Sequence, residues 1–470
     1  MMKLKNFFMQ HLSRLYFIFF IATFFFFLQH FLYQGWDFSA YVLNAQYVFS
    51  GGNYFELYRA PFMSFLLGLF SFFGWKTAEY IYIFSASALF FFSSLFLART
   101  LKINEFYFYL FSVNSFVLLF GLIEGTELLA LAFLELFLVF LIKNKWYAGI
   151  FLAFVCLTRY PLVVFFPLLL FHKGWKTKIL SALAFVLPFI PWFVYNKIHY
   201  GNIFSSLADG YALNILYREY VAHTINISSL LFAANILLPL ILLGIWYFFS
   251  KKDFSREYFI LGSAILLILY SVYSVKADVV RYYIPLTIPF VFFSVYALQK
   301  FSEQRKKLIV LIFILFTLVF TIYSLSQYYQ EDYTKLLSEI TEIEPCALQS
   351  NLWVPLSYSG RLSEAFPSQQ MLDSSIKEGY YVLFYYDARE PAYISNASLL
   401  HTYPVYLETE EYIILGEGCK AIQAVDSLYV ESLNTRLASV YNYTVPEDPC
   451  EILFNSNRLC IFVNKIFTIP

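Results

Sequence analysis

Long apolar stretches separated by short polar loops occupy the first two thirds of the chain. About 20 apolar residues make a helix long enough to cross the roughly 30 Å hydrocarbon core of a bilayer. The pattern predicts eleven membrane-spanning helices, at residues 15–33, 78–99, 105–122, 126–142, 146–157, 160–172, 178–195, 229–249, 257–275, 282–299 and 308–326. A further apolar run, residues 61–74, is short and is expected to lie at the membrane interface.

Basic residues mark alternate loops between these predicted spans. Lys and Arg cluster at residues 3–14, 99–102, 143–145, 173–178, 251–256 and 305–307. Cytoplasmic loops are enriched in Lys and Arg, so the alternation places the N-terminus in the cytoplasm. No small-residue cleavage site follows the first apolar run, which we therefore expect to remain as a span. Eleven crossings then place the residues after the last span outside the cell.

Composition supports a membrane protein. Of the 470 residues, 60% are hydrophobic and 14% are charged, whereas ordinary globular domains are about 25% charged. The net charge is zero, so nothing indicates a nucleic-acid partner. The expected partners are the lipid bilayer and molecules that reach the protein from it.

The residues after the last span predict a separate domain. A helical pattern at 333–340 is followed by strand-like runs at 347–350, 380–386 and 411–415. Short strands among a few helices are typical of a small α/β domain. We therefore divide the chain into a transmembrane domain, residues 1–328 with an outer loop at 34–60, and an extracytoplasmic α/β domain, residues 329–470.

Four of the five cysteines lie in this outer domain: Cys346, Cys419, Cys450 and Cys460. Disulfides persist outside the cytoplasm, so we expect these cysteines to be paired. Three pairings are possible, and we prefer Cys346 with Cys419 and Cys450 with Cys460.

Asp37 is the leading candidate for chemistry, because it follows the first span and lies on the predicted outer side. It begins an amphipathic stretch that ends at Gly51-Gly52, which predicts a helix at the membrane face. Asp37 could instead only cap this helix. Glu56, Tyr58 and Arg59 follow as candidate substrate-binding residues, and the alternative for Glu56 is a solvated loop.

Four further charged residues lie at predicted outer ends of spans. Glu127 begins the fourth predicted span, where an ionisable group is costly and is therefore a functional candidate; it could instead favour the helix dipole. Arg159 and Pro161 break the region 146–172 into two short helices. Arg159 could bind an anion or pair with Glu127 or Asp37. Lys276 and Arg281 could clamp a phosphate, or extend along the membrane surface to reach water.

These residues occur in Trp36-Asp37-Phe38, Tyr58-Arg59-Ala60-Pro61, Gly125-Thr126-Glu127, Thr158-Arg159-Tyr160-Pro161 and Arg281-Tyr282-Tyr283-Ile284-Pro285. In this order they resemble motifs of the GT-C class of integral-membrane glycosyltransferases. The nearest branch is glycosyltransferase family 39, with protein O-mannosyltransferases, lipid A aminoarabinose transferases and archaeal relatives. Residues 350–361 resemble part of the extracytoplasmic domains of these enzymes.

The resemblance implies a mainly α polytopic membrane protein: a GT-C-like helical bundle of about 11 spans, with a small C-terminal extracytoplasmic α/β domain. It implies a donor sugar on a polyprenyl phosphate, such as dolichyl phosphate, and a protein, lipid or glycan acceptor. Asp37 would be the base of an inverting transfer, and Arg281, with Lys276 or Arg159, would neutralise the lipid phosphate.

Three questions stay open at this point. Some relatives carry an acidic metal ligand where this chain has Tyr58, so a divalent metal is possible but no metal ligand is assigned. A transporter or flippase, or a non-catalytic GT-C relative, would also contain charged residues and broken helices. An archaeal plasma membrane is the preferred location.

Overall fold

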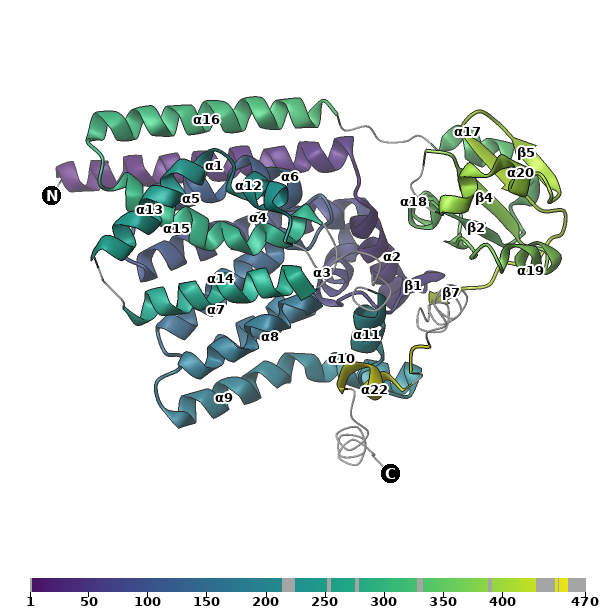
Figure 1. Ribbon diagram of the computed structural model, residues 1–470, viewed down its shortest axis with the longest axis horizontal. Coiled ribbons are helices and arrows are strands. Elements are labelled where there is room, and N and C mark those ends of the chain that lie inside the picture. The colour runs from purple at the N-terminus through teal and green to yellow at the C-terminus, as the bar shows by residue number, and fades with distance from the viewer. Residues whose placement is uncertain are drawn as a thin grey trace. The chain divides into compact units, whose positions relative to one another are not determined.

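The computed structural model describes residues 2–213, 225–251, 255–274, 279–327, 333–387, 391–427, 444–446 and 448–454. Its internal contacts divide the chain into two units (Figure 1). Unit 1 comprises Met1–Gly35 and Ala60–Tyr329, and unit 2 comprises Trp36–Arg59 and Gln330–Pro470.

Unit 1 is a helical bundle. Its elements are α1 (Met2–Leu32), α3 (Phe62–Phe70), η1 (Ser71–Phe73), α4 (Trp75–Thr100), α5 (Glu105–Ser112), α6 (Ser115–Phe120), α7 (Glu127–Ile142), α8 (Ala148–Thr158), η2 (Tyr160–Phe171), α9 (Trp175–Val186), η3 (Leu187–Phe189), α10 (Ile190–Tyr200), α11 (Ser205–Tyr211), α12 (Ile227–Ala234), η5 (Asn235–Leu237), α13 (Leu238–Lys251), α14 (Arg256–Ser274), η6 (Val280–Leu286), α15 (Thr287–Leu298) and α16 (Glu303–Leu325).

Each predicted span coincides with a helical segment of the described chain. Seven helices there are long and apolar enough to cross a membrane, and Phe62–Phe73, Ala148–Thr158 and Tyr160–Phe171 are shorter apolar helices. The predicted span 105–122 was wrong in one respect, because it divides into α5 and α6. Asn114 causes the division: its side chain accepts hydrogen bonds from the amides of Phe116 and Val117 and starts a new helix.

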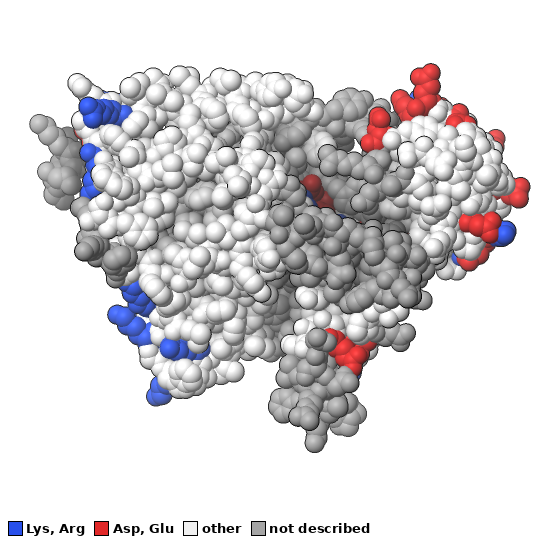
Figure 2. All heavy atoms as spheres, viewed as in Figure 1, with Lys and Arg blue, Asp and Glu red and all other residues white. Residues whose placement is uncertain are grey.

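The basic loops lie together at one end of unit 1, where Figure 2 shows Lys and Arg gathered at the left edge. Arg256 donates hydrogen bonds to the carbonyls of Phe171 (2.6 Å) and Ile142 (3.2 Å), at the ends of η2 and α7. The Lys143 ammonium lies 3.9 Å from the centre of the Phe96 ring on α4. Three basic loops that are distant in sequence therefore share one end, as the alternation of basic loops requires.

Unit 2 contains a five-stranded mixed sheet of order β3-β2-β4-β6-β5. The strands are β2 (Leu348–Ser350), β3 (Glu364–Ala365), β4 (Tyr381–Tyr385), β5 (Val405–Glu408) and β6 (Tyr412–Leu415). β2 pairs in parallel with β3 and β4, while β6 pairs antiparallel with β4 and β5. The helices are α17 (Thr334–Glu339), η7 (Thr341–Ile343), α18 (Trp353–Tyr358), α19 (Leu372–Lys377), η8 (Ala392–Ser395), α20 (Ala397–Leu400) and α22 (Pro449–Phe454).

Side chains alternate between two cores, one on each face of this sheet. Leu383 and Ile414 join the core that includes α17, whereas Val382 and Ile413 join the core that includes α19. Cys346 and Cys419 form a disulfide, which is the pairing preferred from the sequence. Cys450 is buried, and Cys460 lies outside the described residues.

The outer loop after the first helix belongs to unit 2, which differs from the predicted domain division. This loop folds as α2 (Trp36–Ser50) and β1 (Tyr54–Glu56), and β1 pairs in parallel with β7 (Val425–Ser427). Ala40 and Leu43 of α2 pack in one buried cluster with Val354 of α18. Long-range pairing and packing therefore join this loop to the C-terminal domain, which local sequence patterns do not reveal.

Candidate functional site

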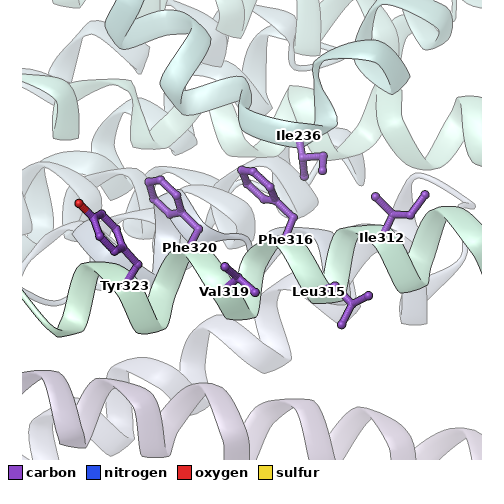
Figure 3. Close-up of a pocket in the computed structure, with 7 residues that line it drawn as sticks. All are labelled: Ile236, Ile312, Leu315, Phe316, Val319, Phe320 and Tyr323. Atoms are coloured by element: carbon purple, nitrogen blue, oxygen red, sulfur yellow. The ribbon is translucent and has the colours of Figure 1, made fainter.

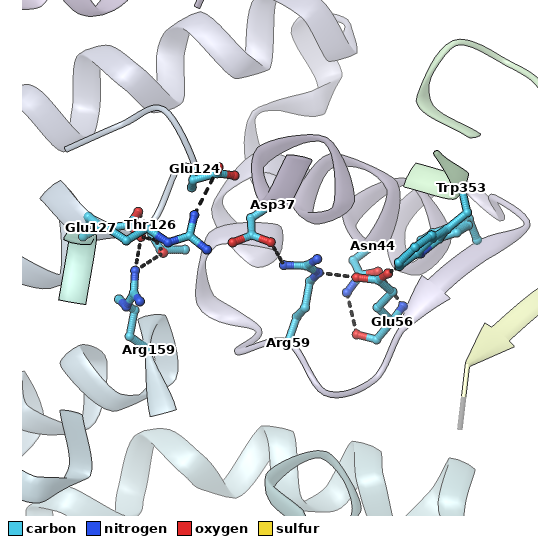
Figure 4. Close-up of polar contacts among 11 residues, drawn as sticks. Asp37, Asn44, Glu56, Arg59, Glu124, Thr126, Glu127, Arg159 and Trp353 are labelled. Atoms are coloured by element: carbon cyan, nitrogen blue, oxygen red, sulfur yellow. Dashed lines mark hydrogen bonds and ion pairs between the residues drawn. The ribbon is translucent and has the colours of Figure 1, made fainter. Parts of the chain in front are cut away.

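The candidate residues form one cluster in each unit. We call the unit 1 group, Glu124, Glu127, Arg159 and Arg281, the arginine–glutamate cluster. We call the unit 2 group, Asp37, Arg59 and Glu56, the Asp37–Arg59–Glu56 chain. Figure 4 shows the contacts within each group.

Helix ends position the arginine–glutamate cluster. Glu127 is the first residue of α7, a 16-residue helix that ends next to Lys143, so about 24 Å of helix separate it from the basic end of the bundle. Arg159 ends α8 in an extended conformation, and η2 begins with Tyr160-Pro161. Pro161 has no N–H group with which to continue the hydrogen bonds of α8. Arg281 lies in η6. The three residues lie at the end of unit 1 opposite the basic loops.

Ion pairs connect the members of this cluster. Arg159 Nη1 donates to Glu127 Oε1, and Arg281 lies 3.5 Å from the same oxygen through Nε. Arg281 Nη1 lies 3.2 Å from Glu124 Oε1. The Glu127 side chain is only 2% exposed, and an unpaired buried carboxylate would be costly. Of the alternatives raised for Arg159, the structure shows the ion pair with Glu127.

A small cavity of about 20 Å³ lies beside this cluster, lined by Glu127, Arg159, Arg281, Tyr282, Ser271 and neighbouring apolar residues. It has room for roughly one water molecule. The Arg159 guanidinium also lies 5.1 Å from the centre of the Tyr282 ring, a favourable cation–π arrangement. The cluster thus brings two cations to one side of a small, mostly apolar cavity, while its own carboxylates balance their charge.

The Asp37–Arg59–Glu56 chain alternates in charge. Arg59 Nη1 donates to Asp37 Oδ1 at 2.8 Å, and Arg59 Nε donates to Glu56 Oε2. The exposed fraction of the side chain rises from 0% for Glu56 through 6% for Arg59 to 26% for Asp37. Burial acts to lower the pKa of Arg59, but the interactions with Glu56, Tyr58, Asp37 and Tyr41 outweigh it and hold that pKa well above its usual value. Arg59 is therefore a permanent cation with a partly accessible carboxylate at one end.

Glu56 is a buried anchor, so the solvated-loop alternative was wrong. Its backbone exchanges two hydrogen bonds with the Asn44 amide, at 2.8 and 2.9 Å. Its Oε1 accepts from the Tyr54 hydroxyl at 2.6 Å and from Trp353 Nε1 at 3.2 Å. Sequence reasoning missed Asn44, Tyr54 and Trp353, although the segment that resembles extracytoplasmic domains contains Trp353.

Aromatic rings flank the Arg59 guanidinium. The ring centres of Tyr41 and Tyr58 lie 5.3 and 5.1 Å from its central carbon. Tyr58, a candidate substrate-binding residue from the sequence, therefore contacts Arg59. Lys276 lies outside the described residues.

The described side chains do not form a group of three His, Cys, Asp or Glu residues that could hold a metal ion. Glu124 and Glu127 pair with arginines. The positive charge of these arginines disfavours a metal cation at the same carboxylates. We derive no metal chemistry from these residues.

Unit 1 also has an apolar groove of about 560 Å³, lined by Ile236 and by Ile312, Leu315, Phe316, Val319, Phe320 and Tyr323 of α16. Figure 3 shows the Phe316, Phe320 and Tyr323 rings projecting from α16 toward the segment that carries Ile236. The groove suits a hydrocarbon chain.

No protein-family profile matches the chain, and comparison with curated proteins finds no significant match. The solved structure of ArnT from Cupriavidus metallidurans bound to undecaprenyl phosphate is similar, with a TM-score of 0.53 and 11% sequence identity. The likeness covers 87% of this chain and 97% of that chain. It shows a shared fold and confirms the predicted GT-C-like helical bundle with a small C-terminal α/β domain.

Proposed function

We propose that this protein is a membrane glycosyltransferase that moves a sugar from a polyprenyl phosphate donor to a hydroxyl group of a protein, lipid or glycan. The shared fold with a protein bound to undecaprenyl phosphate supports this class of donor. The observation that carries the proposal is Asp37, a partly exposed carboxylate held by a buried arginine in the loop after the first apolar helix. A carboxylate in this state can accept a proton.

In the proposed reaction, Asp37 takes the proton of the acceptor hydroxyl. The hydroxyl oxygen forms a bond to the anomeric carbon of the donor, and the bond from that carbon to the phosphate oxygen breaks. The polyprenyl phosphate leaves with the bonding electrons, and the configuration at the anomeric carbon inverts. Arg59 orients Asp37, while Glu56 and Tyr58 hold Arg59.

The departing phosphate needs positive charge nearby. Arg159 and Arg281 provide two cations in one cluster, and the proposal assigns them to the donor phosphate together with Lys276. Glu127 and Glu124 keep the two arginines in place before the donor binds. The apolar groove along α16 is a surface of unit 1 on which the polyprenyl chain could lie.

The expected location is an archaeal plasma membrane, with the N-terminus in the cytoplasm and transfer outside. Dolichyl-phosphate-mannose and dolichyl-phosphate-glucose are the first donors to test.

The test is transfer of label from these two radiolabelled donors to endogenous acceptors by purified protein in membranes. Wild type is compared with Asp37→Asn and with Asp373→Asn, a matched change at an exposed aspartate of α19 that pairs with Lys377. We expect transfer by wild type and by Asp373→Asn, and none by Asp37→Asn. Full activity of a folded Asp37→Asn protein would refute the assignment of the base.

Absence of transfer from both donors would favour a transporter or a non-catalytic relative. Uptake of unchanged substrate into proteoliposomes distinguishes these two, because only a transporter moves a substrate without covalent change.

A further inference from the structure

We infer that Glu56 and Trp353 are positioning residues that fix Arg59, and through it the proposed base Asp37, so that the C-terminal domain sets the geometry of the reaction. This inference rests on the proposed function. All four residues belong to unit 2, and hydrogen bonds join each to the next (Figure 4).

Glu56 is the rigid member of this series. A fully buried carboxylate is tolerated only when its oxygens are satisfied. Both oxygens are engaged: Oε1 accepts from Tyr54 and Trp353, and Oε2 accepts from Arg59. The donors come from β1 and from α18, which is 297 residues away in sequence. Loss of either neutral donor should let the carboxylate rotate.

Arg59 transmits the position of Glu56 to Asp37. The guanidinium is planar and its N–H groups point in fixed directions. Because Nε bonds Glu56 and Nη1 bonds Asp37, a rotation that improves one contact changes the other. The Tyr41 and Tyr58 rings beside the guanidinium further restrict how far it can move.

Trp353 contacts the segment 36–59 at a second point besides Glu56. Its ring meets the ring of Trp36 edge to face, with centres 4.6 Å apart and planes at 81°. Trp36 directly precedes Asp37 at the start of α2. Trp353 therefore touches both the anchor of Arg59 and the residue before Asp37, although the described contacts do not join Trp353 to Asp37 itself.

A residue that acts in this way should affect turnover more than donor binding. We expect Trp353→Phe, which keeps an aromatic ring and removes the N–H donor, to lower kcat three- to tenfold. Small misplacement of a reacting group is sufficient for such a loss. The donor KM should stay within twofold. Tyr54→Phe, which removes the other donor to the same oxygen, should lower kcat by a similar factor and leave the donor KM within twofold.

The matched control is Tyr386→Phe, which removes a tyrosine hydroxyl that bonds the exposed Glu408 in the same unit. It should keep the kcat of wild type. In a Glu56→Ala background, Trp353→Phe should have no further effect on kcat, because the acceptor is gone. Wild-type kcat in both Trp353→Phe and Tyr54→Phe, or equal losses with and without Glu56, would overturn the inference.

A second measurement does not depend on transfer. Asp37 is accessible enough to react with a water-soluble carbodiimide and glycinamide, and mass spectrometry of the full-length protein follows its modification. We expect Trp353→Phe and Tyr54→Phe to speed labelling of Asp37 at least twofold, with Asp373 labelled as in wild type. Unchanged labelling of Asp37 would refute the positioning role even if no donor is found. If wild type fails to transfer sugar but the labelling rates differ as expected, the proposed function fails and the positioning chain stands.

Discussion

Glu56→Ala should lower the stability of unit 2 by about 3 kcal/mol. The change removes the partner of Arg59 Nε and the acceptor of the Tyr54 hydroxyl and Trp353 indole. Glu56 is fully buried and the Arg59 side chain is only 6% exposed, so water cannot replace the lost contacts without rearrangement.

The magnitude follows from the burial of the pair. Removing one partner of a buried ion pair typically costs about 3–5 kcal/mol, because the other charge stays buried. Arg59 keeps Asp37 at 2.8 Å, which places the expected loss at the lower end. About 3 kcal/mol corresponds to roughly 100-fold in the unfolding equilibrium. For a unit of this size it corresponds to a fall of about 6–12 °C in melting temperature.

Hydrogen exchange of the full-length protein measures this loss within unit 2. Amides of the central strand β4 should exchange roughly 100-fold faster in Glu56→Ala than in wild type. Glu56→Gln should lose less, since it keeps an oxygen that can accept from Tyr54 and Trp353. Glu408→Ala is the matched control, because Glu408 also accepts from a tyrosine hydroxyl and from the imidazole of His401 but is exposed. A stability change below about 1 kcal/mol for Glu56→Ala would show that the buried contacts contribute little.

Further predictions concern both units. Arg281→Ala should raise the donor KM at least tenfold, since it removes a cation from the proposed phosphate site; steady-state kinetics with varied donor test this, and an unchanged KM would exclude the role. Cys419→Ser opens a disulfide to Cys346 that spans 73 residues and should cost about 4 kcal/mol; reductant should then lower the melting temperature by less than it does in wild type. Hydrogen bonds that the His401 ring donates to Glu408 and to a backbone carbonyl raise the pKa of His401 above its usual value. This pair therefore stabilises the fold below pH 6.5, and its contribution disappears as pH rises through the folded pKa; NMR titration should show a lower His401 pKa in Glu408→Gln.

Much of the fold follows from local sequence patterns. The length of each apolar run predicted the helices of unit 1, because the side chains of such a run face either the protein interior or lipid. The alternation of basic loops predicted that the loops contacted by Arg256 and Lys143 lie at the same end of unit 1. The strands β2, β4 and β6 lie within the predicted runs. For β4 and β6, four or five consecutive apolar residues suffice to predict a central strand. Asp37 and Arg159 were found in the same way, at a helix start and at a proline break.

Tertiary structure alone decided how these charged residues are used. Glu127 is paired with Arg159 and lies 3.5 Å from Arg281, which are 32 and 154 positions away, and no local pattern specifies which of several acids an arginine meets. Glu56 is hydrophilic in a short loop, which suggests solvent exposure, yet Trp353 and Arg59 enclose it. The loop at 36–59 joins the C-terminal domain because β1 pairs with β7 and α2 packs on α18. Periodicity reports which face of a segment is buried, whereas the partner that buries it is chosen by the packing of the whole chain.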